Sequence, residues 1–504
     1  MPFDETFDVI VVGLGAAGAC AAIEAGRAGA RVLVVEKASF DGGTTSMSGG
    51  VIYCGGGTEI QRACGFQDSA EDMRAYLMAA GGPEPDAEKV ELYSQMSVDH
   101  FNWLVDLGVP FKARFWPEYA EPTTDDGLYY SGCEHTSPFN RIARPAPRGH
   151  VVQAEGGAGD PTTINAGRIL MDVLTQAARD AGATFLFDAE LVSLVKDDEG
   201  AATGAVVGVH GKQRRLEAPG GIVLTTGGFI GNRDMLARHA PRGLELQPLA
   251  SAHDDGDGIL IAEAAGARSI NMDALAFMCP VLEPHPFVQG ILFNVEGERF
   301  VTEDVNHKRI AERCLTTQSG RMYLLVDDSI YSEPRYPKEL IAAAESIEKL
   351  ERLLDFLPPG ALQRTVEKYN ESAAKGVDSL LGKLPENLRP LDRPPFGVFD
   401  CSLSGEQPFM TFTLGGLHTR TSGEVLDPEG RTIPGLFAAG RSTSCLSAQN
   451  CFTSGIQLGE GTFFGRQAGR SAGLRAKARD EILGRVAKAG KPAATAPVNS
   501  EGAR

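Results

Sequence analysis

The sequence predicts an α/β fold, and three observations support this prediction. Residues 7–13 (FDVIVVG) form a short apolar run of the kind that makes a buried parallel strand. The small residues of 16–30 favour a helix packed closely on a sheet, and residues 31–35 form a second apolar strand. Glycine makes up 60 of the 504 residues, well above the usual share of about 7%, so many turns and close backbone approaches are expected.

The turn after the first strand carries a dinucleotide-binding motif. Gly13, Gly15 and Gly18 have the spacing G-x-G-x-x-G. The first glycine allows a tight turn, the second lets the backbone approach a pyrophosphate, and the third lets helix and strand pack closely. Glu36 follows the second strand, where a carboxylate accepts hydrogen bonds from the ribose hydroxyls of an adenosine. We therefore expect a Rossmann-like dinucleotide site.

Three further glycine-rich segments indicate that the dinucleotide is FAD. Residues 42–46 (GGTTS), after Lys37, supply backbone and hydroxyl donors for a long ligand. Residues 221–228 (GIVLTTGG) and 433–441 (IPGLFAAGR) have the form of later flavoprotein strands, one contacting the nucleotide and one passing under the flavin. The expected FAD contacts are Gly13, Gly15, Ala16, Ala17, Gly18, Glu36, Lys37, Gly42, Gly43, Thr44, Thr45, Ser46, Ser48, Gly49, Gly50, Gly227, Gly228, Asp257, Gly440, Arg441, Ser454, Gly455 and Ile456.

The nucleotide-binding features lie at both ends of the chain, which indicates a discontinuous cofactor domain. We expect this Rossmann-like domain to comprise residues 1–271 and 395–478, with a smaller α+β cap domain inserted at 272–394. The Ala/Lys/Pro-rich residues 479–504 are expected to form a flexible tail. A ligand cleft is expected between the cofactor domain and the cap.

Composition argues against several other classes of protein. The net charge of −18 provides no basic field for nucleic acid, and no apolar stretch reaches the roughly 18 residues of a membrane span. The start of the chain lacks the basic region and cleavage site of a secretory leader. The nine scattered cysteines fit a reducing cytoplasm better than a disulfide framework or a zinc site. We expect a cytoplasmic protein without a bound metal.

Nearly the whole chain resembles the fumarate reductase/3-ketosteroid dehydrogenase flavoproteins, especially the 3-ketosteroid Δ4-(5α)-dehydrogenases. The resemblance rests on residues 48–66, 125–134, 145–150, 297–304, 412–419, 435–444 and 453–469. It implies noncovalent FAD, because covalent relatives carry a flavin-linking histidine where Gly43 stands. It also implies oxidation of a ring ketone to an α,β-unsaturated ketone, with an electron acceptor that the sequence does not identify.

This reaction needs a polarised carbonyl, a base for the α-proton and a flavin that accepts the β-hydride. Ser454 and Gly455, which precede a helix expected from Ile456, resemble the donors to the ketone and to the flavin C2 carbonyl. The positive end of that helix would stabilise reduced, anionic flavin. An ordinary helix N-terminus is the alternative interpretation.

The sequence departs from the resemblance at both tyrosines of the ketosteroid enzymes. Phe452 stands where one tyrosine precedes the Ser–Gly pair, and Asn306 stands where the other follows the Glu–Asp pair. Tyr130, with its neighbour Tyr129, is a candidate replacement for the missing base, although the two could simply be an aromatic packing pair. His307 is a second candidate, since a histidine titrates near neutral pH, although it could simply be a surface histidine in a charged run.

Two cations follow His307, and their role bears on the substrate. Lys308 and Arg309 could pair with a substrate carboxylate, or they could belong to a solvated face. With Phe452 and Asn306 also in the substrate pocket, we expect a desaturase of a cyclic ketone, either a small keto acid such as 4-oxocyclohexanecarboxylate or a 3-ketosteroid.

Three alternatives to this function stay open. They are a 3-ketosteroid Δ4-(5α)-dehydrogenase proper, a fumarate-reductase-like ene reductase, and a non-catalytic FAD-binding protein. The ene reductase is disfavoured because Phe412 replaces the histidine expected there for dicarboxylate binding, and because no arginine occurs within residues 445–455 (CLSAQNCFTSG).

Overall fold

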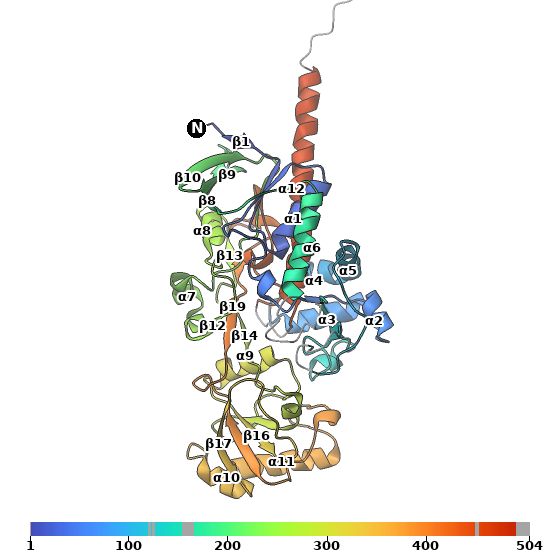
Figure 1. Ribbon diagram of the computed structural model, residues 1–504, viewed down its shortest axis with the longest axis vertical. Coiled ribbons are helices and arrows are strands. Elements are labelled where there is room, and N and C mark those ends of the chain that lie inside the picture. Colours follow the sequence, from blue (N-terminus) through green and yellow to red (C-terminus); the bar gives the residue numbers. More distant parts are fainter. Residues whose placement is uncertain (1, 119–121, 123–125, 154–165, 449–452, 490–504) are drawn as a thin grey trace, which may run out of the picture.

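The computed structural model describes residues 2–118, 122, 126–153, 166–448 and 453–489. The molecule is elongated, with the nucleotide-binding half above and the cap below (Figure 1). Helices from the first third of the chain flank the middle of the molecule. The α/β architecture with an inserted cap confirms the predicted fold class.

A six-stranded sheet organises the nucleotide-binding half. Its strand order is β21-β22-β11-β2-β3-β7, and the strands from β22 to β7 run parallel. All four residues of each of the inner strands β2, β3 and β11 are buried, as in sheets covered by helices on both faces. The bounds are β21 Glu424–Leu426, β22 Thr432–Ala438, β11 Gly221–Leu224, β2 Val9–Val12, β3 Val32–Val35 and β7 Thr184–Leu186.

Small residues let two helices approach each other beside this sheet. Helix α1 (Ala16–Arg27) joins β2 to β3 and packs along α12 (Ile456–Ala489). A side chain at Gly465 or Gly469 of α12 would overlap the backbone carbonyls of α1, so this close contact requires glycine there. Helix α6 (Ala166–Asp180) also packs against α1.

Helix α12 continues to Ala489, past the predicted start of the tail at residue 479. The extension is rich in Ala, Lys and Arg, which are strong helix formers, so the composition that suggested a flexible tail also favours a helix. Residues 490–504 lie outside the described part of the chain.

Smaller sheets and helices complete the nucleotide-binding half. One sheet has the strand order β1-β10-β9-β8, and a second has the order β4-β6-β5. The strands are β1 Glu5–Thr6, β10 Lys212–Glu217, β9 Ala202–Val209, β8 Ala189–Lys196, β4 Val51–Tyr53, β6 Gly149–Val151 and β5 Leu128–Tyr129. The helices are α2 Glu59–Ala63, α3 Ala70–Ala80, α4 Ala87–Gln95, α5 Ser97–Asp106, α7 Arg233–His239 and α8 Asp257–Ala264.

Two short sheets connect this half to the cap, whose own sheet has the order β15-β16-β18-β17. Strand β18 follows the predicted boundary at residue 394, so the cap sheet extends past that boundary. The connecting strands are β12 Gln247–Pro248, β19 Met410–Thr413, β14 Leu275–Met278, β13 Ser269–Ile270 and β20 Gly416–Leu417. The cap comprises β15 Ile291–Phe293, β16 Tyr323–Asp327, β17 Glu339–Ala344, β18 Phe396–Asp400, α9 His307–Thr317, α10 Ile347–Leu353 and α11 Ala361–Lys375.

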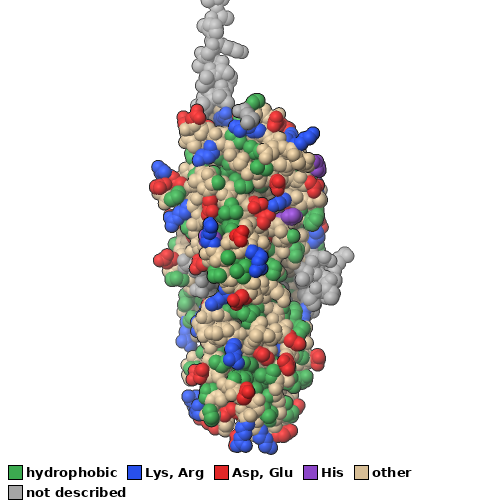
Figure 2. Space-filling view, turned by 90° about the vertical axis from the view of Figure 1, so that its left-hand side faces the viewer, with side chains coloured by type: hydrophobic (Ala, Val, Ile, Leu, Met, Phe, Trp, Pro, Cys, Tyr) green, Lys and Arg blue, Asp and Glu red, His purple; other side chains and the backbone are tan. Residues whose placement is uncertain are grey.

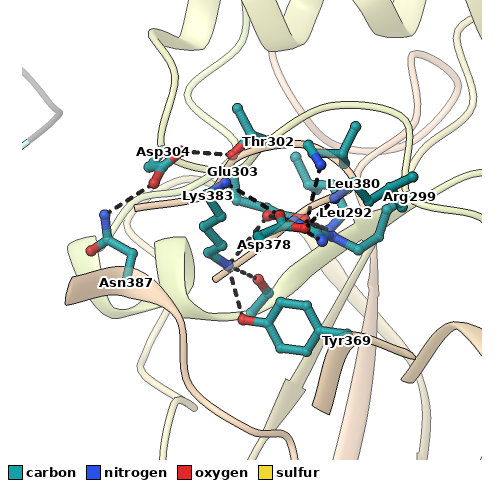
Figure 3. Close-up of polar contacts among 12 residues, drawn as sticks. Leu292, Arg299, Thr302, Glu303, Asp304, Tyr369, Asp378, Leu380, Lys383 and Asn387 are labelled. Carbon is teal, nitrogen blue, oxygen red and sulfur yellow. Dashed lines mark hydrogen bonds and ion pairs between the residues drawn. The ribbon is translucent and has the colours of Figure 1, made fainter. Parts of the chain in front are cut away.

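A buried ion cluster fixes the cap segment that precedes α9 (Figure 3). Arg299 forms two hydrogen bonds with the Glu303 carboxylate, at 3.0 and 2.6 Å, and a third with Asp378 at 3.0 Å. The Lys383 ammonium lies 3.2 Å from Glu303. All four side chains are almost fully buried, so each charge depends on its partners.

Acidic and basic side chains are interspersed along the whole face that Figure 2 shows. Among the helices in the described ranges, none combines the length and the apolar character that crossing a membrane requires. The described residues also contain no cluster of side chains suited to a metal ion.

Candidate flavin and ketone site

A cavity of about 550 Å³ runs along the carboxyl ends of β2, β3 and β11 to the start of α12. This is the edge where ligands bind in open α/β sheets. It is lined by residues within 12–17, 35–37, 43–51, 189–191, 225–227, 249–258, 410–412, 440–441 and 454–461, with Met278, Lys308 and Tyr336 from the chain between.

Most of the predicted FAD contacts line this cavity. They are Gly13, Gly15, Ala16, Ala17, Glu36, Lys37, Gly43, Thr44, Thr45, Ser48, Gly49, Gly227, Asp257, Gly440, Arg441, Ser454 and Gly455. The others are not part of the wall: Gly18, Gly42, Ser46, Gly50, Gly228 and Ile456.

The glycines of the first turn fit a bound dinucleotide in three different ways. Gly13 has a φ of +98°, and a Cβ there would lie 2.5 Å from the carbonyl oxygen of Thr225. A Cβ on Gly18 would overlap the Gly13 carbonyl. A Cβ on Gly15 would have its nearest neighbour 3.7 Å away, so backbone at this residue faces open cavity, as close approach to a pyrophosphate requires. Gly43 likewise has nothing within 4 Å of a Cβ.

The two charged residues after β3 are held by the protein itself. Glu36 accepts hydrogen bonds from the backbone N–H groups of Leu14 at 2.6 Å and Ala38 at 2.9 Å. Its carboxylate thereby ties the glycine turn to the end of β3. Lys37 forms ion pairs with Asp255 at 2.7 Å and Asp257 at 2.9 Å, so it connects β3 to the start of α8.

An Arg441–Asp254 ion pair joins the later segments of the cavity wall. The guanidinium donates to both carboxylate oxygens, at 2.7 and 3.0 Å, and to Thr44 Oγ1 at 2.9 Å. Asp254 also accepts from the Gly228 N–H at 2.6 Å. The Arg441 guanidinium lies 5.5 Å from the ring centroid of Phe412. Four segments distant in sequence are thus held in one wall.

The start of α12 and the cap helix α9 meet at the other end of the cavity. The Ser454 N–H donates to the carbonyl of Ser131 at 2.7 Å, so this predicted backbone donor is already engaged. The Ser454 hydroxyl is buried in the cavity wall and has no hydrogen-bond partner among the described residues. Gly455 has a φ of +84°, and a Cβ there would lie 2.7 Å from Val51 Cγ1, which keeps this helix start close to β4.

Lys308 reaches the same end of the cavity from α9. Its ammonium lies 3.4 Å from the Thr453 carbonyl oxygen and 5.8 Å from the ring centroid of Phe412. The side chain is buried, with a relative exposure of 4%. Of the two predicted cations, Lys308 therefore lines the cavity, whereas Arg309 is half-buried and pairs with Glu312 at 3.1 Å.

The predicted tyrosine pair lies away from the cavity wall. Tyr129 is buried in β5 and packs with Val51, Val151 and Trp116. Tyr130 contacts the rings of Phe66, Phe115 and His135. Neither tyrosine lines the cavity, so the packing interpretation fits this pair better than a catalytic role.

Asn306 and His307 cap and begin α9 without joining the wall. The Asn306 side chain accepts from the Lys308 N–H at 3.0 Å and donates to the Ser131 carbonyl at 2.8 Å. Burial, with a further effect of Lys308, lowers the pKa of His307 to about 3, which makes it a weak base at neutral pH. Phe452 lies outside the described residues.

Several wall residues escaped the sequence prediction because they belong to no recognisable motif. Met278 and Met410 come from the strands between the halves, and Tyr336 comes from the cap. By contrast, Asp254 stands in an acidic run before α8 that also holds the predicted contact Asp257, but its pairing with Arg441 was not predicted. These residues reach the cavity through long-range contacts that local patterns do not encode.

Comparison with known proteins agrees with this geometry. The model of a family described as FAD binding domain matches residues 8–455. The structure of 3-ketosteroid-Δ4-(5α)-dehydrogenase from Rhodococcus jostii RHA1, in complex with 4-androstene-3,17-dione, is 44% identical with a TM-score of 0.88, covering 94% of this chain and 98% of that one. A 3-oxo-5-alpha-steroid 4-dehydrogenase of Comamonas testosteroni is 27% identical over 87% of this chain and 93% of its own length.

Reductases are also among the relatives. A probable fumarate reductase of Shewanella frigidimarina is 27% identical over 94% of this chain and 76% of its own length. The chain therefore belongs to the FAD binding domain family, and it is an FAD-dependent oxidoreductase of the fumarate reductase/3-ketosteroid dehydrogenase flavoproteins.

Proposed function

We propose that the protein is a desaturase of a cyclic ketone, which removes an α-proton and a β-hydride to form an α,β-unsaturated ketone. The observation that carries this proposal is the meeting of the Ser454 hydroxyl, the α12 start and Lys308 of the cap at one end of the flavin cavity. The 44% identity to a Δ4-(5α)-dehydrogenase over almost the full length of both chains supports it. When bound, FAD supplies the acceptor for the hydride.

Groups of the protein itself polarise the ketone and remove the α-proton. We assign the Gly455 N–H, at the positive end of α12, to polarising the ketone. We assign Ser454 to taking the α-proton, with its hydroxyl passing its own proton on to water in the same step, because Ser454 lines the cavity and its hydroxyl has no partner among the described residues. The residues placed outside the wall, Tyr130 and His307, are not assigned a step.

The charges in the wall make a dicarboxylate substrate less suitable. Lys37 is paired with two aspartates and Arg441 with Asp254. A fumarate-type substrate needs cations for both of its carboxylates, and these two side chains are committed to the protein. Lys308 suits one anionic or strongly polar group at the ketone end, which keeps both a cyclic keto acid and a 3-ketosteroid as candidates.

A turnover assay with an artificial electron acceptor tests the proposal and separates the substrates. Purified enzyme is given androstanedione or 4-oxocyclohexanecarboxylate, and mass spectrometry follows the loss of two hydrogens from the ketone. We expect turnover of a cyclic ketone. Turnover of androstanedione alone would exclude the small keto acid, and turnover of neither ketone, with bound FAD present, would contradict the proposal.

Three single substitutions test the assignment of the base. Ser454→Ala should retain FAD and lose about 10²-fold or more in the rate of ketone oxidation, as expected for a group that transfers the proton. Tyr336→Phe removes another hydroxyl of the wall and should have a smaller effect. Ser422→Ala is the matched control, because the Ser422 hydroxyl donates to Glu424 at the start of β21 and does not line the cavity. A larger loss in the rate of ketone oxidation in Tyr336→Phe than in Ser454→Ala would instead assign the base to Tyr336 of the cap.

A further inference from the structure

Four large apolar side chains share one face of the short β12-β19-β14 sheet, which lies between the nucleotide-binding half and the cap (Figure 1). Strand β14 pairs with β19 so that Met278 lies opposite Met410, and Phe412 follows two residues later on β19. On the other side of β19, the Leu249 N–H donates to the Thr411 carbonyl at 2.8 Å, in continuation of the β12 pairing. Because side chains alternate between the two faces of a sheet, Leu249, Met278, Met410 and Phe412 form one apolar floor.

This apolar floor is open to the cavity. All four of its side chains line the cavity and are only half-buried. The opposite face of the same strands is closed, since Leu275, Thr411 and Thr413 are buried. Large apolar side chains that face an internal cavity indicate a surface that binds an apolar part of a ligand.

The apolar floor runs from a charged end towards the cap. The ring centroid of Phe412 lies 5.8 Å from the Lys308 ammonium and 5.5 Å from the Arg441 guanidinium. Met278 and Met410 lie at the other end, where β14 leads into the cap and β19 returns from it. A strand rises about 3.4 Å per residue, so Met410 lies about 7 Å further along β19 than Phe412.

This spacing bears on how far a bound ketone extends. Ser454 and Lys308 line the end of the cavity to which we assign the carbonyl, and Phe412 is the member of the floor beside Lys308. A single ring held there over Phe412 would leave the two methionines uncovered. A skeleton of several fused rings would continue over both of them and remove their apolar surface from water.

We propose that Met278 and Met410 are specificity-determining residues, which bind the part of the ketone remote from its carbonyl and select fused-ring ketones over single-ring ones. This inference rests on the proposed function. The unbranched thioether side chain of methionine adapts to irregular apolar shapes, which suits contact with a polycyclic skeleton. A small keto acid gains nothing from this end of the floor, so the substrate is an apolar ketone with more than one ring.

Equilibrium binding of unsaturated ketones to the oxidised holoenzyme tests this assignment without turnover. The flavin absorption spectrum is followed as 2-cyclohexenone, with one ring, or 4-androstene-3,17-dione, with four fused rings, is added. Wild type should bind the four-ring ketone about tenfold or more tightly than 2-cyclohexenone. Met278→Gln and Met410→Gln should each weaken binding of the four-ring ketone by about tenfold, because a polar amide loses its hydration against an apolar skeleton. Binding of 2-cyclohexenone should stay as in wild type.

Two further variants make the comparison specific. Met410→Leu keeps an apolar side chain and should bind the four-ring ketone nearly as tightly as wild type. Met272→Gln is the matched control, because Met272 is also half-buried, precedes β14 and does not line the cavity. It should bind both ketones as wild type does. Met410→Ala provides the test if Met410→Gln fails to fold.

Three results would overturn the assignment. The first is equal affinity of wild type for the two ketones, and the second is equal weakening of both ketones in Met278→Gln and Met410→Gln. The third is loss of FAD from these two variants, which would place the methionines against the cofactor instead.

The proposed function and this inference fail in different ways. If no cyclic ketone bleaches the flavin of wild type, the desaturase is wrong and the inference falls with it. If wild type is bleached, and both glutamine variants bind the four-ring ketone as wild type does, only the inference is wrong.

Discussion

Single residues at the cofactor end were predictable because their role is set by backbone geometry. A Cβ at Gly13 or Gly18 of the glycine motif would collide with neighbouring backbone, whereas Gly15 faces open space. The ketone end was predicted less well. Asp254 pairs with Arg441 across 187 positions of the chain, and Tyr130 and His307 have reactive side chains but lie outside the wall. Side-chain chemistry alone does not say which way a residue faces.

The two glycines Gly15 and Gly18 should respond oppositely to the same substitution. Gly15→Val places its side chain in open cavity, so the protein should fold with a near-normal unfolding midpoint and purify with little flavin. Gly18→Val overlaps the Gly13 backbone and should destabilise the fold by about 1–3 kcal/mol or more.

Flavin absorbance per mole of protein and thermal unfolding check this pair of variants. A Gly15→Val protein with full flavin content would contradict the placement of the pyrophosphate. A Gly18→Val protein as stable as wild type would contradict the close helix–strand contact.

At the scale of elements, the apolar strands and the small-residue helix were recognisable because their patterns are local. Strand β2, helix α1 and strand β3 form where the sequence predicted them. The end of α12 and the extension of the cap sheet through β18 were not predicted, because Ala/Lys-rich segments suit both helix and tail and because strand partners are chosen across long distances. The predicted domain boundaries stay a prediction.

The cap should lose stability in acid through its buried cluster (Figure 3). The charges of Arg299 and Lys383 outweigh the effect of burial and hold the pKa of Glu303 below its ordinary value of 4.5. A carboxyl with a lowered pKa stabilises the folded state above its unfolded pKa, and this contribution is lost as the pH falls below about 4.5. Glu303→Gln removes the charge and should destabilise the cap at neutral pH by about 3–5 kcal/mol.

Chemical unfolding of wild type and Glu303→Gln across pH 3–7 measures this effect. The difference in unfolding free energy between the two proteins should shrink as the pH falls. A constant difference would show that the Glu303 charge does not contribute.

At the scale of the whole molecule, one chain assembles a flavin site from segments near both of its ends and closes it with a cap from its middle. The sequence predicted this arrangement because the glycine-rich nucleotide-binding segments can be recognised near both ends of the chain. It did not predict the buried polar residues near Ser454, among them Tyr76 of α3, whose hydroxyl lies 3.0 Å from Thr453 Oγ1, and Glu134, which accepts from the Gly132 N–H. Buried carboxyls of this kind also make the free energy of unfolding depend on pH.

Glu134 and Glu460 should make the folded protein less stable as the pH rises from about 4.5 to about 7. Their raised pKa values mean that the folded state holds protons that the unfolded state has released, so stability falls through this window. Each group should contribute on the order of 3 kcal/mol. The double variant Glu134→Gln/Glu460→Gln should lose this slope relative to wild type in urea unfolding at constant salt, and parallel curves would contradict the burial of both carboxyls.

Anaerobic titration of the flavin with a cyclic ketone distinguishes a desaturase from an ene reductase. We expect the oxidised flavin absorbance to bleach as androstanedione or 4-oxocyclohexanecarboxylate is added, in step with formation of the unsaturated ketone. Adding the matching enone to the reduced enzyme should restore the oxidised flavin absorbance only as far as the equilibrium between the two flavin and substrate states allows. A flavin that no cyclic ketone bleaches, but that fumarate or another activated alkene reoxidises after chemical reduction, would contradict the desaturase and assign the protein to the ene reductases.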